Sequence, residues 1–286
     1  MHVLTLTKKM NLKAPTPMHV AVVSIGRSGT SLIARILDQV LGVDFGDEAD
    51  HIPRNHNNPD GYFENAAFLA FDERVLQAAN AWVLNPPPLD YVAALPESQR
   101  AAFEQEALAL LAKYAQNKPR FGWKDPRLSF TLPFWRIASP NLIPVIAVRK
   151  PYSVLSSIGA QLDRPVESMA GLWFTYYQHV FHHTQGLNRF FVNFDGLLSD
   201  PLPIVMALAT HLGIHADSEE VQGKLAEIIK PQQSKHSFAT PAANAATAAA
   251  ATPILGARTT DLHAYLVQST QDGGQPNANK LADLLR

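Results

Sequence analysis

Short apolar runs alternate along this chain with segments whose apolar side chains recur every three or four residues. The short runs are rich in Val, Ile and Phe, which is typical of buried strands, and they cover residues 19–25, 120–124, 142–148 and 189–194. Helical spacing covers residues 31–41, 68–83, 103–114, 169–180 and 201–212, and a further helix is expected to begin at Pro151. This alternation predicts an α/β fold with a central parallel sheet flanked by helices on both faces.

The same pattern divides the chain into one domain with a segment on either side. We assign residues 19–236 to the domain and residues 1–18, which end in two closely spaced prolines, to a lead-in segment. Residues 239–251 hold nine alanines among thirteen positions, a low-complexity composition typical of a surface linker. Residues 237–286 are therefore expected to form an Ala-rich segment and a C-terminal tail, either docked on the domain or separate from it.

Composition and charge narrow the classes of function. A hydrophobic fraction of 47% over 286 residues allows a large core and excludes wholesale disorder. The net charge of -1 argues against a broad nucleic-acid-binding surface, so any anion site must be local. The absence of cysteine removes disulfides, thiolate catalysis and Cys-ligated metals. With neither a secretory signal nor an apolar run of about 18 residues, we expect a cytoplasmic protein without a membrane span.

The loop after the first predicted strand has the composition of an anion-binding site. It reads SIGRSGTS over Ser24–Ser31, where glycines let backbone N–H groups turn toward one point and the next helix adds its partial positive charge. Arg27 adds a permanent cation, and Thr30 and Ser31 add hydroxyl donors. Thr30 stands where a Walker loop has lysine, so that pattern is not met. An ordinary turn whose hydroxyls cap the helix remains the alternative.

This loop, followed by LIARIL, resembles the 5'-phosphosulfate loop of sulfotransferases that use 3'-phosphoadenosine 5'-phosphosulfate (PAPS). A second family element is a strand that ends in Arg, with Ser eight residues later; here these are Arg149 and Ser157. In the family, this Arg and Ser bind the 3'-phosphate of the donor. The resemblance implies a P-loop-like fold and a donor site made by Gly26, Arg27, Ser28, Gly29, Thr30, Ser31, Arg149 and Ser157.

The resemblance is closest to the tyrosylprotein and Golgi-like branch of the family. That branch continues with Gly-Glu-Glu and Ile-Pro-Arg, which residues 46–48 (GDE) and 52–54 (IPR) match at the same spacing from Arg27. It also has a Lys-Asp-Pro segment with a catalytic lysine, which residues 123–127 (WKDPR) match. The four elements stand in the family's order between Val20 and about Ser157, roughly half of the chain.

The resemblance implies roles for the charged residues of these segments. Glu48 occupies the position of the catalytic base, and Lys124 with Arg27 would stabilise the oxygen left on the product. Glu64, in the segment GYFE, is the rival base, because aromatic neighbours would raise its pKa if it were buried. Glu48 is otherwise one more carboxylate of an acidic loop, and Lys124 a solvated lysine at a strand end. Arg54 is expected to orient the acceptor or support Glu48.

One difference from the family narrows the class of acceptor, and a second group of residues raises the question of a zinc site. Asp50 stands where the branch has an Arg two residues beyond its base, which argues against an acidic peptide as the acceptor. His179 and His183 have the i, i+4 spacing of a zinc pair, with His182 beside them. No third ligand is evident, and histidines beside aromatic residues more often pack.

The sequence therefore predicts a PAPS-dependent sulfotransferase. It would move a sulfuryl group to a hydroxyl or amine and release 3'-phosphoadenosine 5'-phosphate (PAP), without a metal, because Lys and Arg can carry the charge. The acceptor would be a small molecule, a saccharide or a peptide, and no nucleic acid is expected. One alternative is a P-loop ATP-dependent kinase, disfavoured by the missing lysine. The other is a non-catalytic nucleotide-binding module, disfavoured by the presence of both Glu48 and Lys124.

Overall fold

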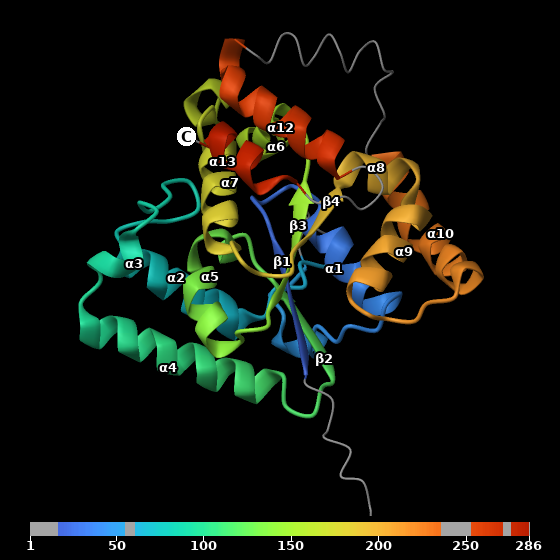
Figure 1. Cartoon of the computed structure of the whole chain (residues 1–286), viewed down its shortest axis with the longest axis horizontal. Coiled ribbons are helices and arrows are strands. Elements are labelled where there is room, and N and C mark those ends of the chain that lie inside the picture. The colour runs from blue at the N-terminus through green and yellow to red at the C-terminus, as the bar shows by residue number, and fades with distance from the viewer. Residues whose placement is uncertain (1–16, 55–60, 236–252, 271–275, 286) are drawn as a thin grey trace, which may run out of the picture.

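The centre of the fold is a parallel four-stranded sheet, seen in a computed structural model that describes residues 17–54, 61–235, 253–270 and 276–285 (Figure 1). The strands pair in the order β2-β1-β3-β4, with bounds β1 (Met18–Val23), β2 (Arg120–Lys124), β3 (Ile143–Val148) and β4 (Phe190–Asn193). All three strand pairings are parallel, so every strand ends at the same edge of the sheet. In the register, Val22 faces Lys124 on one side and Val145 on the other.

Helices connect the strands and cover both faces of the sheet. Their bounds are α1 (Thr30–Gln39), α2 (Ala66–Ala78), α3 (Tyr91–Ala94), α4 (Glu97–Tyr114), α5 (Leu128–Ala138), α6 (Pro151–Leu162), α7 (Leu172–His183), α8 (Phe194–Ser199), α9 (Pro201–His211), α10 (Ser218–Lys235), α12 (Ala257–Ser269) and α13 (Ala278–Leu285), with short 3₁₀ turns η1 (Glu48–Asp50) and η2 (Val166–Met169). No helix within the described ranges is long and apolar enough to cross a membrane.

The core consists of two apolar layers separated by the sheet. Ala21 and Val23 of β1 pack with α2, α4, α5, α6 and α7 on one face, and Val20 and Val22 pack with α1, α8, α9 and α10 on the other. Figure 1 shows α2, α4, α5 and α7 to the left of the strands and α1, α8, α9 and α10 to their right. Successive side chains of a strand point to opposite faces of the sheet. Because both faces are buried, the β1 residues that point to either face have to be apolar. The predicted α/β class is confirmed.

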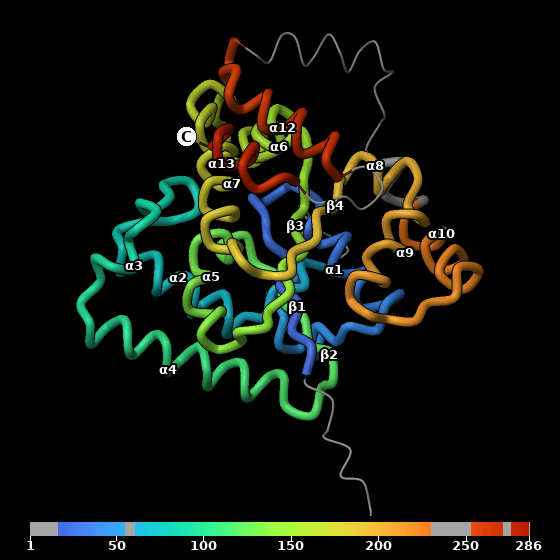
Figure 2. The backbone as a smooth tube through the Cα atoms, viewed as in Figure 1, coloured from blue at the N-terminus to red at the C-terminus, as the bar shows by residue number. Residues whose placement is uncertain are grey.

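The C-terminal helices pack on the first of these layers. Leu262 and Leu266 of α12 are fully buried, and Leu281 of α13 is nearly so. The helix α12 contacts β3, α6 and α7, and Figures 1 and 2 show it beyond the end of β3. The Ala-rich run 239–251 lies outside the described residues.

Several helices do not follow from the periodicity. The helix α5 is apolar on nearly every side and contains Pro133, so it lacks the amphipathic stripe that would reveal it. The strand predicted over residues 189–194 ends earlier, at Asn193. The Asn193 side chain accepts from the backbone N–H groups of Asp195 and Gly196, and this N-cap starts α8 at Phe194.

Candidate active site

The anion loop predicted from the sequence connects β1 to α1 at the carboxyl edge of the sheet. Arg27 and Gly29 both have left-handed backbone angles, with φ of 67° and 88°. The Arg149 guanidinium, which follows β3, donates to the Arg27 carbonyl over 2.7 Å. Arg27 Nε in turn donates to Ser157 Oγ over 2.9 Å. The two segments that carried the resemblance are therefore in direct contact.

Two side-chain atoms of this cluster are buried without a hydrogen-bond partner among the described residues. They are Ser28 Oγ and Arg149 Nε. Such atoms are rare in folded proteins, and each one calls for an explanation. Burial also lowers the pKa of the Arg149 guanidinium, and the charge of Arg27 acts in the same direction. Anionic groups of a bound ligand would supply partners for these atoms and offset the repulsion between the two cations, so the residues fit a nucleotide with more than one anionic group.

An aromatic side chain that the sequence did not indicate packs against the loop and against Arg149. The ring of Phe194 lies under the Arg149 guanidinium, with 4.6 Å between the guanidinium carbon and the ring centroid. A Cβ atom added at Gly29 would lie 2.0 Å from Cδ2 of Phe194. Gly29 is therefore required twice, for its positive φ and for the space that the ring occupies.

The predicted lysine and the rival base form a buried ion pair at the other side of β1. Lys124 Nζ, at the end of β2, lies 2.5 Å from Glu64 Oε1, and these side chains are only 3% and 8% exposed. Burial raises the pKa of the Glu64 carboxyl; the charge of Lys124 opposes this shift, and that of Asp125 adds to it. The anion loop is close by, because the Ser31 hydroxyl donates to the Tyr62 carbonyl over 3.4 Å.

Glu48, the base that the resemblance indicates, has a different environment. It begins η1, its side chain is 74% exposed, and it pairs with Arg54 over 2.5 Å. The structure therefore pairs Glu48 with Arg54 and pairs Lys124 with Glu64. The two candidate bases differ in burial and in the cation that each one meets.

The Lys-Asp-Pro-Arg turn after β2 is held by contacts that the sequence did not indicate. The Asp125 carboxylate accepts from the backbone N–H of Arg127 over 2.7 Å and from its guanidinium over 3.0 Å. The same guanidinium donates to Glu73 of α2 over 2.7 Å. Pro126 faces Gly26, where an added Cβ would lie 3.7 Å from the proline ring. These contacts fix the turn, and with it the position of Lys124 relative to the loop.

The three histidines of α7 lie at the opposite edge of the sheet. A carbonyl oxygen can only accept, so His179 Nε2 carries the hydrogen shared with the Pro87 carbonyl over 2.9 Å. Burial lowers the pKa of His179 to about 4, and the Nδ1 atom of its neutral ring accepts from His183 Nε2 over 3.2 Å. The described residues contain no group of three or more side chains suited to hold a metal. In the structure the two rings hydrogen-bond to each other, and His179 packs edge-on against Phe130.

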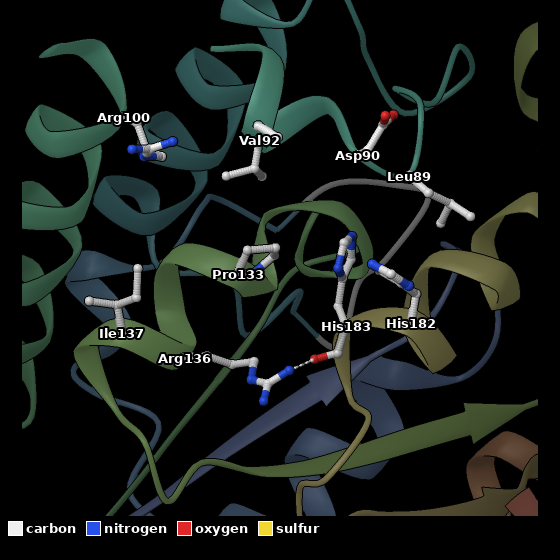
Figure 3. A pocket seen from close by; sticks show the side chains of 10 residues that line it. Leu89, Asp90, Val92, Arg100, Pro133, Arg136, Ile137, His182 and His183 are labelled. Carbon is white, nitrogen blue, oxygen red and sulfur yellow. Dashed lines mark hydrogen bonds between the residues drawn. The ribbon is translucent and has the colours of Figure 1, made fainter. Parts of the chain in front are cut away.

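A pocket of about 540 Å³ lies beside these histidines (Figure 3). The helix α5 returns from the end of β2 to the beginning of β3, so its last turn lies at the amino edge of the sheet. The pocket is at that end, and Figure 3 shows Arg136 bonded to the His183 carbonyl below it. This pocket is thus remote from the anion loop; it is lined by Leu89, Asp90, Val92, Ala93, Arg100, Pro133, Arg136, Ile137, His182 and His183.

Comparisons with solved structures find nine similar chains, and the following three of them are sulfotransferases. A domain of the curacin biosynthetic pathway is 15% identical with a TM-score of 0.43, covering 73% of this chain and 77% of that one. A domain of the Synechococcus PCC 7002 olefin synthase is 20% identical with a TM-score of 0.45, covering 82% and 88%. A sulfotransferase of Mycobacterium avium is 14% identical with a TM-score of 0.41, covering 80% and 70%.

The family assignment rests on the sequence itself. A search of curated proteins finds no match. The sequence profile of the sulfotransferase family, in contrast, matches residues 17–218, which is well over half of the chain. That range includes the anion loop, the Lys-Asp-Pro-Arg turn and both members of the Arg149–Ser157 element, and it confirms the resemblance. The chain belongs to the sulfotransferase family.

Proposed function

We propose that this protein transfers a sulfuryl group from PAPS to an acceptor hydroxyl or amine. The observation that carries the proposal is the contact between Arg27, Arg149 and Ser157, together with the unpartnered buried atoms Ser28 Oγ and Arg149 Nε. Two cations and two buried donors within one cluster suit a ligand with more than one anionic group. PAPS carries such groups at both its 5' and 3' positions.

The two ends of the donor would be held by different elements. Backbone N–H groups of residues 26–31 and the N-terminus of α1 would hold the 5'-phosphosulfate. Arg149 and Ser157 would hold the 3'-phosphate. Lys124 follows β2 and Arg149 follows β3, on opposite sides of β1. The reacting sulfuryl group would therefore lie toward Lys124 and the 3'-phosphate toward α6.

The reaction breaks the bond between sulfur and the bridging phosphate oxygen, and it forms a bond between sulfur and the acceptor atom. The acceptor proton passes to a carboxylate, and the electron pair of the broken bond stays on the phosphate oxygen of PAP. The Lys124 ammonium and the Arg27 guanidinium would stabilise that oxygen as its charge grows. As in phosphoryl transfer, positioning and electrostatics would supply most of the rate enhancement.

The base is one of two carboxylates, and the geometry favours Glu64. A base must lie within hydrogen-bond reach of the attacking atom, close to the cation at the leaving oxygen. Glu64 is in contact with Lys124, and burial raises its pKa toward the pH at which a base works best. Glu48 is favoured by the resemblance, but both Glu48 and its partner Arg54 are largely exposed. Arg54 would then help to orient the acceptor.

The donor proposal is tested by thermal denaturation with PAP, and with ATP and magnesium. A ligand at 100 times its dissociation constant stabilises the native state by about 2.7 kcal/mol, so a bound nucleotide is easily detected. We expect stabilisation by PAP and a smaller effect from ATP. Radiolabelled PAPS with a panel of phenols, sugars and amines then tests for sulfated products. Stabilisation by ATP alone would contradict the proposal and favour a kinase.

The base is tested by Glu64→Gln and Glu48→Gln as a matched pair. Each change keeps the shape of the side chain but removes its ability to accept the proton. We expect Glu64→Gln to lower kcat by about 10²–10⁴, the usual effect of losing a general base, and Glu48→Gln to have a much smaller effect. PAP affinity is measured for both variants, to show that the donor site persists. The reverse order of the two kcat values would assign the base to Glu48.

A further inference from the structure

The helix α12 lies beyond the part of the chain that the family profile matches, yet it covers the donor edge of the sheet. The match ends at residue 218, and α12 spans Ala257–Ser269. Leu262 and Leu266 anchor it in the core, where it contacts β3, α6 and α7. In Figure 1 the arrowhead of β3 points toward α12. Residues of this helix are therefore close to the end of the strand that Arg149 follows.

One polar side chain of α12 points into this packing without a hydrogen bond. His263 Nε2 is buried and has no partner among the described residues. The imidazole meets the Trp173 ring edge-on, with 6.0 Å between the ring centroids. Trp173 Nε1 in turn donates to the Arg149 carbonyl over 3.2 Å. A single side chain thus separates His263 from the backbone of the residue proposed to hold the 3'-phosphate.

The charges around His263 also belong to the donor edge. Burial lowers the pKa of His263 to about 4, so the ring is neutral at pH 7; the charge of Asp195 opposes this shift and that of Lys150 adds to it. Lys150 and Asp195 form an ion pair over 3.5 Å. Lys150 directly follows Arg149, and Asp195 follows Phe194, whose ring lies under Arg149. His263 therefore shares the surroundings of Arg149.

Unpartnered buried atoms gather at this edge of the sheet. Seven buried side-chain atoms in the described ranges lack a partner, and Ser28 Oγ, Arg149 Nε and His263 Nε2 are three of them. Buried polar atoms without a partner are rare in folded proteins, so three of them on residues that follow β1, follow β3 and pack beside β3 are explained together by one bound ligand. Two of the three already belong to the proposed donor site.

We propose that His263 is a further donor-binding residue, whose Nε2–H donates a hydrogen bond to the 3'-phosphate of the nucleotide. This inference rests on the proposed function. The order of the strands determines which end of the donor His263 meets: α12 packs on β3, whereas Lys124 follows β2 on the far side of β1. The residue would therefore contribute to selectivity for 3'-phosphorylated nucleotides and would have no part in the sulfuryl transfer itself.

The test compares two ligands that differ only in the 3'-phosphate. Isothermal titration calorimetry gives the Kd of adenosine 3',5'-diphosphate (PAP) and of adenosine 5'-monophosphate (AMP) for the full chain and its variants. His263→Phe keeps an aromatic ring against Trp173 but removes the nitrogen. We expect it to weaken PAP by about 10- to 100-fold, the effect of losing a hydrogen bond to a charged group, and to leave AMP unchanged. His182→Phe is the matched control, because His182 is exposed at the opposite edge, and it should change neither Kd.

The outcomes separate the inference from the proposed function. Equal losses for PAP and AMP would assign His263 a purely structural role, and no loss for either would exclude a contact; each result overturns the inference. If the wild-type chain failed to bind PAP, the donor proposal itself would fall.

A measurement on the wild-type chain covers the case in which His263→Phe does not fold. Long-range ¹H–¹⁵N spectra of the histidine side chains should show a shift of the His263 Nε2 signal with PAP and none with AMP. The same spectrum with both nucleotides would overturn the inference.

Discussion

The buried ion pair between Lys124 and Glu64 predicts a strongly non-additive effect on stability. The two charged atoms lie 2.5 Å apart, and neither side chain is more than 8% exposed. Removing one partner leaves the other charge buried and unpaired, which costs about 3–5 kcal/mol in comparable pairs. Removing both leaves no buried charge, so uncharged side chains of similar volume restore much of the loss.

The prediction is measured with a double-mutant cycle of Lys124→Met, Glu64→Gln and the double variant. Urea unfolding at pH 7 gives the free energy of unfolding of each. Gln can still accept a hydrogen bond from the ammonium, so we expect Glu64→Gln to cost about 2–3 kcal/mol and Lys124→Met about 3 kcal/mol or more. The double variant should be at least about 2 kcal/mol more stable than the sum of the single changes implies.

An exposed pair near the same strand supplies the control. Lys118 lies 2.8 Å from Asp44, but the side chains are 24% and 46% exposed, so Lys118→Met should cost less than about 1 kcal/mol. If the changes at Lys124 and Glu64 added within about 0.5 kcal/mol, the two residues would be energetically independent and the reasoning from burial would be refuted.

Three further changes have expected outcomes. Gly29→Ala should destabilise the native state by more than about 2 kcal/mol in thermal unfolding and remove the stabilisation by PAP, because the new Cβ would lie 2.0 Å from Phe194 at a φ of 88°. Burial raises the pKa of Asp72 well above 3.8, so the native state retains a proton that the unfolded chain releases. The free energy of unfolding therefore falls as the pH rises above 3.8. Asp72→Asn should flatten this fall, measured by urea unfolding between about pH 4 and 8. Burial lowers the pKa of His179 from 6.5 to about 4, so between these two pH values the unfolded chain binds more protons than the native state. The free energy of unfolding should drop by up to about 3 kcal/mol as the pH falls through this range. His179→Gln should reduce the drop, measured by the same urea unfolding.

The strands and the contact between Arg27 and Arg149 were predictable because they depend on short stretches of sequence. A strand buried on both faces is a nearly continuous apolar run, and the runs at residues 20–23 and 142–148 have this pattern. Arg27 and Arg149 stand within a few residues of the ends of two such runs. Parallel strands end at a common edge, so a correct strand prediction also brings these two cations together.

The remaining features depend on contacts between distant segments, which no local pattern reveals. Glu64 and Lys124 are sixty positions apart, and only the packing of the loop before α2 against the end of β2 makes them an ion pair. The sequence left open whether Lys124 is solvated, and its burial became visible only in the fold. Phe194 was expected in a strand, where its ring would have had no relation to Gly29. Local propensity could not show that Asn193 caps a helix there.

Charge balance explains how a chain of net charge -1 would offer the proposed site for a highly anionic donor. The cations at the carboxyl edge have partners within the protein: Lys124 pairs with Glu64, Lys150 with Asp195, and the Arg149 guanidinium with the Arg27 carbonyl. Without the donor, these partners lower the cost of burying positive charge. When the donor binds, its anionic groups would replace or share these protein partners. The affinity for the donor would then be the difference between two sets of charge-assisted contacts. Glu64 would lose part of its contact with Lys124 as the nucleotide binds. Its carboxylate would then be a stronger base beside the acceptor. The same ion pair would thus serve stability before binding and proton transfer after it.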